Sequence, residues 1–218
     1  MSKIYKLNIF TKILFVLSAT VFLLINSIFT IGFFKPIYSH IYDRTDIGGN
    51  TGFSKEMYLK EIDNYRSYLI SNNDDALLNP PRYNKDDLAH MVDVRKLFQL
   101  GKIISIFGLI IIIAIIIYAV KRNAICELIK LAKWILIIPI FVLPFLLMDF
   151  DALWIKFHEI FFTNDLWLMD PDVSLMINLL PGEIFNAISI ATVVFYYFSS
   201  MILVLILKFL SRRKDEIK

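Results

Sequence analysis

The sequence predicts an all-α membrane protein with four transmembrane helices and a small helical extracytoplasmic cap. Of its 218 residues 57% are hydrophobic, and the mean hydropathy of +0.63 is too high for a soluble domain. The chain also contains four long uncharged stretches, at Ile13–Phe34, Ile103–Val120, Trp134–Met148 and Ile184–Leu207. Two longer polar segments lie between them, and these form the predicted cap.

Each uncharged stretch is interpreted as one transmembrane helix, because about 20 apolar residues cross the hydrocarbon core of a bilayer. The first, second and fourth stretches contain 22, 18 and 24 residues. The third has 15 residues, but it can gain a turn or two from the residues before it, with Lys130 and Lys133 extending toward the headgroups.

The basic residues near the span ends predict the orientation in the membrane. The N-terminal tail carries three lysines, and the 121–133 and 208–218 segments carry four and five basic residues. Such residues concentrate on the cytoplasmic side, so both termini should be cytoplasmic. The 149–183 segment has one basic residue against seven acidic ones, which fits the outer side. The predicted parts are the tail and first span (1–34), the first outer segment (35–102), the second span (103–120), a cytoplasmic connection (121–133), the third span (134–148), the second outer segment (149–183), the fourth span (184–207) and a basic cytoplasmic tail (208–218).

Composition excludes several classes of function. The net charge of +3 comes from the basic segments beside the spans, and their basic residues lack the interleaved aromatic side chains of a nucleic-acid site. We therefore expect no nucleic-acid partner. Cys126 is the single cysteine, which excludes a disulfide framework and a cysteine metal site.

The first outer segment should contain two helices. One has an apolar face at helical spacing, formed by Tyr58, Ile62, Tyr65 and Leu69. The other should begin near Asp86 or Asp87, either of which can cap it, and continue through His90 into the second span.

The second outer segment places a histidine on an apolar face. If a helix begins at Asp151, His158 shares one face with the aromatic residues Trp154, Phe157 and Phe161. An ionisable side chain in such a place costs free energy unless it is paired or used, so His158 is a candidate functional residue. A buried histidine bonded to a backbone carbonyl is the structural alternative.

The other two histidines are also predicted to lie outside. His90 precedes Asp93 by three residues on one helix, and a carboxylate there can fix the imidazole tautomer and raise its basicity. An ordinary ion pair on the helix surface is the alternative. His40 is interpreted as a solvated or interfacial side chain.

Several familiar chemistries are absent from the sequence. His158 and Glu159 begin a zinc-protease pattern, but its second histidine would fall at Phe162. Neither a Gly-x-Ser-x-Gly elbow nor a glycine-rich phosphate loop occurs, and the histidines and outer carboxylates lack metal-ligand spacing. We therefore expect no metal and no cofactor. What remains is acid/base catalysis by imidazoles on a lipid-borne substrate.

Two blocks of sequence carry a family resemblance. The stretch from Phe157 to Pro171, with its Phe-His-x-x-Phe-Phe-x-Asn-Asp-x-Trp pattern, and its continuation from Leu179 to Phe185 resemble the signature of the lipoprotein intramolecular transacylases. The run from His90 to Arg95 resembles the second motif of that family, and the length and four-span layout match as well.

The resemblance implies an enzyme of the bacterial cell membrane that acts on diacylated lipoproteins. It would move the sn-2 acyl chain of the diacylglyceryl-cysteine to the α-amino group, giving a lyso-form lipoprotein without a cofactor. The resemblance points to His158 and His90 as the essential pair on the extracytoplasmic side. Supporting candidates are Asp93, Asn164, Asp165, Trp167 and Asp170. The implied partners are lipoprotein substrates and membrane lipid, and we expect a monomer.

The acyl shift that the resemblance implies is a reaction that an imidazole can catalyse as a general base. An acyl shift from ester to amide is downhill, and attack within one molecule closes a ring of about eight atoms, which the enzyme must hold. An α-amine has a pKa of roughly 7.7 to 8.0, so a modest base suffices. We expect His158 to act as general base, while His90, oriented by Asp93, assists proton transfer or polarises the acyl carbonyl. Two alternatives stay open: another membrane acyltransferase or lipid hydrolase, and a non-enzymatic accessory or sensor protein.

Overall fold

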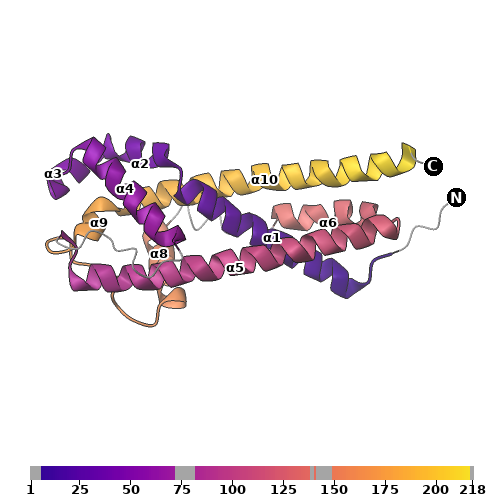
Figure 1. Cartoon of the computed structure of the whole chain (residues 1–218), viewed down its shortest axis with the longest axis horizontal. Helices are drawn as coiled ribbons and strands as arrows, with labels where there is room; N and C mark the ends of the chain where they lie inside the picture. The colour runs from indigo at the N-terminus through magenta and orange to yellow at the C-terminus, as the bar shows by residue number, and fades with distance from the viewer. Residues whose placement is uncertain (1–5, 72–81, 138–139, 141–148, 217–218) are drawn as a thin grey trace. The chain divides into compact units, whose positions relative to one another are not determined.

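The computed structural model describes residues 6–71, 82–137, 140 and 149–216, and this part of the chain is built of helices joined by turns, with no strand. In chain order the helices are α1 (Ile9–Gly32), α2 (Lys35–Tyr42), α3 (Ile47–Thr51), α4 (Lys55–Ile70), α5 (Lys85–Lys121), α6 (Ile125–Ile137), α8 (Phe150–Phe161), α9 (Leu175–Leu179) and α10 (Gly182–Glu216) (Figure 1). The predicted all-α class is confirmed.

Three of the described helices are long and apolar enough to cross a membrane: α1, α5 and residues 182–212 of α10. The 37 residues of α5 rise about 55 Å, whereas the hydrocarbon core is about 30 Å thick. Since its uncharged run begins at Ile103, the polar first turns, including His90, lie outside the length that the core accommodates. Most of the third predicted span, residues 138–139 and 141–148, lies outside the described residues, so the four-span count stays a prediction.

The chain divides into two compact units. The first unit comprises Met1–Ile31, Lys102–Pro144 and Ala191–Lys218. Its interior is apolar, with a few polar contacts that join its helices. The Asn26 side chain donates a hydrogen bond to Ser105 Oγ (2.7 Å), and Tyr196 donates to the carbonyl of Ile135 (2.8 Å). Such interhelical bonds satisfy polar groups that lipid cannot.

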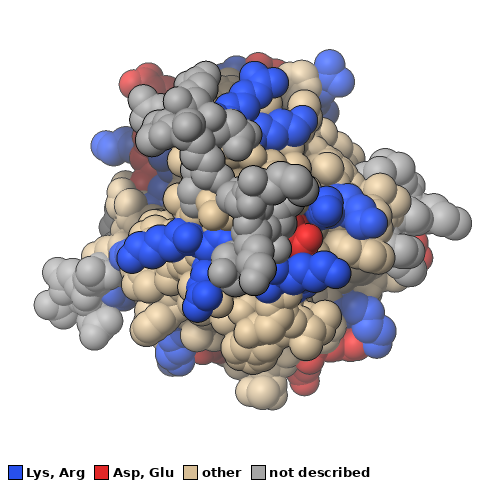
Figure 2. All heavy atoms as spheres, turned by 90° about the vertical axis from the view of Figure 1, so that its right-hand side faces the viewer, with Lys and Arg blue, Asp and Glu red and all other residues tan. Residues whose placement is uncertain are grey.

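Basic side chains gather where the helices of the first unit end. Figure 2 shows Lys and Arg side chains around the face on which α5 ends, α6 begins and α10 approaches its C-terminus. Near this face, the partly exposed Lys12 of α1 forms an ion pair with Glu127 of α6 (2.6 Å). The described residues therefore keep the clustering of basic charge that the sequence indicated.

The second unit comprises Gly32–Gly101 and Phe145–Ile190. Its core is rich in tyrosine, with Tyr38, Tyr58, Tyr65, Tyr68 and Tyr83 all buried. The apolar face predicted for the first cap helix is present on α4, where Tyr68 is the buried residue of the last turn and Leu69 is only partly buried.

The start of α5 differs from the prediction that Asp86 or Asp87 caps it. Asn84 is the capping residue, because its Oδ1 accepts a hydrogen bond from the Asp87 backbone N–H (2.7 Å). Asp87 lies in the first turn of the helix and is fully buried, and Ser174 donates a hydrogen bond to its Oδ1 (2.5 Å). Ser174 also caps α9, so Asp87 connects the first turn of α5 to that short helix.

Candidate active site

His158 lies in the last turn of α8 with its side chain buried. The helix begins after Asp149, whose Oδ1 accepts a hydrogen bond from the Ala152 N–H (2.9 Å). His158 is 5% exposed, while Lys156 and Glu159 pair with one another on a different face (2.5 Å). The apolar face predicted from the sequence therefore holds the imidazole.

One ring nitrogen of His158 is occupied by the helix itself. Its Nδ1 lies 2.8 Å from the carbonyl oxygen of Trp154, one turn earlier. A carbonyl only accepts, so Nδ1 carries the proton and Nε2 keeps its lone pair. The backbone bond anticipated as a structural alternative is therefore present, and it fixes the tautomer in which Nε2 is a base.

His90 of α5 lies beside His158. The two ring centroids are 5.9 Å apart with the planes inclined by 30°, and Phe162 lies 5.0 Å from the His90 ring. His90 is 6% exposed, and its Nδ1 has no hydrogen-bond partner among the described residues. The structure thus brings together the two histidines that the sequence singled out, and His90 is buried rather than part of a surface ion pair.

Aromatic side chains surround His158 on several sides. Trp154 and Phe157 meet its ring edge-on, with centroids at 4.6 and 5.4 Å. Trp167, from the loop after α8, is stacked on it at 4.8 Å and 26°. Trp154 in turn stacks on Phe185 of α10 at 4.3 Å. Rings from α8 and from the loop after it therefore contact the imidazole, and Phe185 of α10 packs on one of them.

Burial keeps both imidazoles neutral. Burial and, to a lesser extent, the nearby His158 together lower the pKa of His90 to about 4, and the charge of Asp93 opposes the shift. Burial also lowers the pKa of His158, opposed by the hydrogen bond to the Trp154 carbonyl. Near pH 7 both side chains are therefore present in the base form.

Asp93, expected to orient His90, makes its hydrogen bonds elsewhere. Its Oδ1 lies 3.0 Å from Lys96 Nζ, and its Oδ2 accepts a bond from Asn164 Nδ2 (2.9 Å). These two bonds lower the pKa of Asp93. Asn164 also accepts the Leu166 N–H (3.2 Å). Asp93 and Asn164 therefore join α5 to the loop that carries Trp167, while Asp93 acts on His90 through its charge.

Replacing Asp93 with Ala should remove the hydrogen bond that joins α5 to Asn164 in the loop after α8. We expect a coupling of about 1 kcal/mol between Asp93→Ala and Asn164→Ala in a double-mutant cycle of unfolding in detergent, since one charge-assisted hydrogen bond is lost in either variant. Lys96→Ala is the matched control, because its side chain is 72% exposed and its ion pair should contribute less than about 0.5 kcal/mol. Strictly additive effects of the first two changes would contradict the connection.

The two remaining acidic candidates, Asp165 and Asp170, accept hydrogen bonds from the backbone in turns. Asp170 Oδ1 accepts the Asp172 N–H (3.0 Å), and the Asp165 carbonyl accepts the Leu168 N–H (3.0 Å). Neither carboxyl group has a contact with His90 or His158 in the part of the chain that is described. Sequence reasoning missed the buried pair of Asp87 and Ser174, because no spacing signals a contact between residues 87 positions apart.

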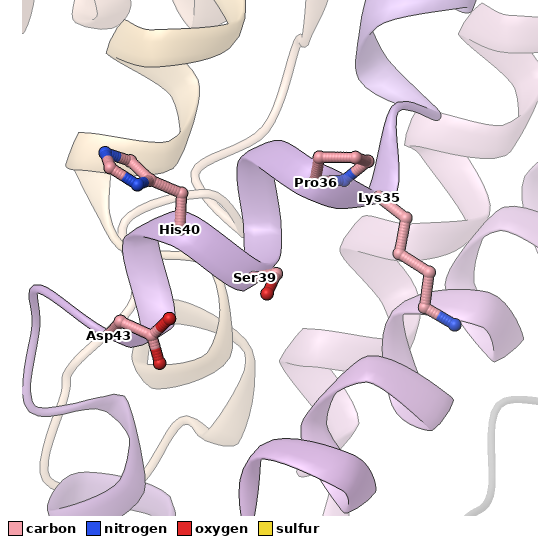
Figure 3. A pocket seen from close by; sticks show the side chains of 5 residues that line it. All are labelled: Lys35, Pro36, Ser39, His40 and Asp43. Carbon is pink, nitrogen blue, oxygen red and sulfur yellow. The ribbon is translucent and has the colours of Figure 1, made fainter.

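A surface cavity of about 430 Å³ lies elsewhere, along α2. Lys35, Pro36, Ser39, His40 and Asp43 line it, and Figure 3 shows Ser39 and His40 pointing away from each other. This serine is therefore not activated by its neighbouring histidine. Within the described residues, no three His, Cys, Asp or Glu side chains are grouped closely enough to hold a metal ion.

Long apolar helices and a buried pair of imidazoles outside the uncharged runs are the features of a helical membrane protein. The model of the lipoprotein intramolecular transacylase family matches residues 13–185. The chain belongs to this family, which is a family of acyltransferases, and the resemblance inferred from the sequence is confirmed. No curated protein matches the chain at a significant level.

Solved structures share the fold. That of the membrane integral lipoprotein intramolecular transacylase from Bacillus cereus matches with a TM-score of 0.81 at 20% identity, over 95% of this chain and 97% of that chain. A variant of the same enzyme with a histidine replaced by arginine has a TM-score of 0.81, again at 20% identity, over 96% and 94% of the two chains. A variant with that histidine replaced by alanine has a TM-score of 0.80 at 20% identity, over 95% and 94%.

Proposed function

We propose that the protein moves the sn-2 acyl chain of a diacylglyceryl-cysteine to the α-amino group of the same residue, giving a lyso-form lipoprotein. The observation that carries this proposal is the contact between the buried rings of His90 and His158 in a member of the transacylase family. The substrate holds the amine, the ester carbonyl and the leaving oxygen in one molecule. The protein therefore needs to hold these three groups close together and to transfer a proton from the amine to the leaving oxygen.

His158 is the proposed general base. Its Nε2 takes a proton from the amine as the amine nitrogen bonds to the ester carbonyl carbon, giving a tetrahedral intermediate. The bond between that carbon and the glyceryl oxygen then breaks, and the proton moves from Nε2 to the oxygen. No proton is gained or lost over the cycle, so the reaction needs no further reactant. The fixed tautomer of His158 supports this assignment, because Nδ1 donates to the Trp154 carbonyl and Nε2 keeps its lone pair.

His90 is proposed to bind the acyl carbonyl. With a pKa of about 4 it is neutral at physiological pH, and a neutral imidazole has one N–H donor and one acceptor. Its Nδ1 has no partner among the described residues. A substrate group that supplies the missing hydrogen bond would be held next to His158, and an imidazole N–H aimed at the carbonyl would stabilise the developing oxyanion.

The placement in the membrane follows from the charges. We propose four spans, at 13–34, 103–120, 134–148 and 184–207, with both termini cytoplasmic and the 35–102 and 149–183 segments forming an extracytoplasmic cap. The basic residues at the ends of α5 and α10 support this orientation. His90 and His158 would then lie at the outer surface, where diacylated lipoproteins are the substrate partners and membrane lipid surrounds a monomer.

The test follows the acyl chain. The purified full-length protein is mixed with two synthetic diacylated lipopeptides that differ in both peptide and acyl chains. Because transfer within one molecule leaves the mass unchanged, tandem mass spectrometry must locate the chain, and we expect it on the α-amine with no exchange between the two peptides. Exchanged products would indicate intermolecular transfer and free fatty acid would indicate hydrolysis. Either result, or no change in either lipopeptide, would contradict the proposal.

A further inference from the structure

Proton transfer to His158 creates a positive charge in a buried site. Burial disfavours that charge, and the surroundings offer little to neutralise it. From α8 itself, Lys156 and Glu159 pair with one another. From α5, His90 is neutral and Asp93 is hydrogen-bonded to Lys96 and Asn164.

Among the described residues, the other elements around His158 bring no carboxyl contact either. The loop after α8 contributes Phe162 and Trp167, while its acids Asp165 and Asp170 have no contact with the imidazole among the described residues. From α10, Phe185 reaches the site through its stacking on Trp154. The stabilising groups in contact with the ring are therefore the Trp154 carbonyl and aromatic side chains.

Trp167 has the geometry that stabilises a cation. Its ring is stacked on the imidazole at 4.8 Å and 26°, so that the negative face of the indole lies against His158. Trp154 and Phe157 instead meet the imidazole at 77° and 87°. Tryptophan is also the aromatic side chain with the strongest cation–π attraction.

The loop holds Trp167 in this position. Asn164 is bound to Asp93 of α5 and accepts the Leu166 N–H, and the Leu168 N–H donates to the Asp165 carbonyl (3.0 Å). These bonds fix the backbone on both sides of Trp167. The indole plane is therefore set by the loop as well as by its contact with the imidazole.

We propose that Trp167 is a positioning residue that stabilises, by stacking, the positively charged His158 formed when it takes the proton of the substrate amine. This inference rests on the proposed function, in which His158 is the base. A stacked cation contributes a factor of roughly 2 to 30 to an equilibrium of this kind. Trp167 thereby raises the basicity that burial of His158 reduces.

The test measures the protonation of His158 directly. The full-length protein, labelled with ¹⁵N-histidine, is titrated in detergent, and the signal of His158 is assigned by its loss in His158→Gln. Trp167→Leu should lower the pH of half-protonation by about 0.5 to 1.5 units and lower kcat about 3- to 30-fold, with KM nearly unchanged. Trp167→Phe keeps a stacked ring of weaker attraction. Its midpoint and its kcat should therefore fall between those of the unmodified protein and those of Trp167→Leu.

Phe157→Leu is the matched control, since it removes an aromatic contact that is edge-on. It should leave the midpoint of His158 in place. Equal midpoints for Trp167→Leu and the unmodified protein, or an equal shift in Phe157→Leu, would overturn the inference. Failure of the proposed function would be distinguishable, because either the unmodified protein would then give no intramolecular acyl transfer or His158→Gln would retain it, whatever the titration shows.

Discussion

Replacing His158 with Gln should lower the rate of acyl transfer by about 100- to 10,000-fold, the range that a general acid/base contributes. Glutamine keeps a polar side chain of similar reach but has no lone pair that takes a proton near neutral pH. In the proposed mechanism the missing group is Nε2, since Nδ1 donates to the Trp154 carbonyl. Tandem mass spectrometry of the lipopeptide product gives the rate.

His40→Gln is the matched control for this loss. His40 is exposed on α2 and lines the cavity that contains neither candidate histidine, so its replacement should leave the rate unchanged. Thermal unfolding in detergent should confirm that both variants fold. Acyl transfer at the original rate by folded His158→Gln would remove His158 from the mechanism.

Replacing Asp87 with Ala should destabilise the protein strongly. It leaves the buried Ser174 hydroxyl and the Asn84 N–H without their acceptor, which costs about 2 to 4 kcal/mol. For a chain of this size that corresponds to a fall of about 5 to 15 °C in Tm. Differential scanning fluorimetry in detergent measures it.

Two neighbouring changes separate this effect from a general loss of acidic charge. Asp86 precedes Asp87 at the same helix start but is exposed, so Asp86→Ala should change stability by no more than about 0.5 kcal/mol. Asp87→Asn keeps the volume and one oxygen acceptor, and should lose less than the alanine variant. Equal melting temperatures for Asp86→Ala and Asp87→Ala would show that the buried connection to Ser174 contributes nothing.

Features that depend on local periodicity could be predicted from the sequence. The apolar face of α4, the burial of His158 on α8 and the continuous helix from the cap into the second span follow from residue spacing along one helix. The family followed from a run of residues around His158. In each case the information lies within a short stretch of chain.

Features that depend on contacts between residues far apart in the chain could not be predicted from the sequence. Asp93 was expected to orient His90 because both lie on one helix, but its carboxyl group bonds to Asn164, 71 residues away. Similarly, Asp87 was expected as a possible helix cap, and burial against Ser174 gives it a different role. Even the approach of His90 to His158 rested on the family resemblance, since spacing alone could not give the separation of their rings.

The hydrogen bond between His158 Nδ1 and the Trp154 carbonyl has a consequence for how the enzyme tolerates mutation. Its acceptor belongs to the main chain, and the separation of four residues is the repeat of the α-helix. No side-chain substitution at Trp154 deletes that oxygen, so the choice of the basic nitrogen is inherited from helix geometry. A histidine whose tautomer is set by an aspartate loses that tautomer when the aspartate is replaced, whereas here no single side chain other than His158 itself supplies the bond.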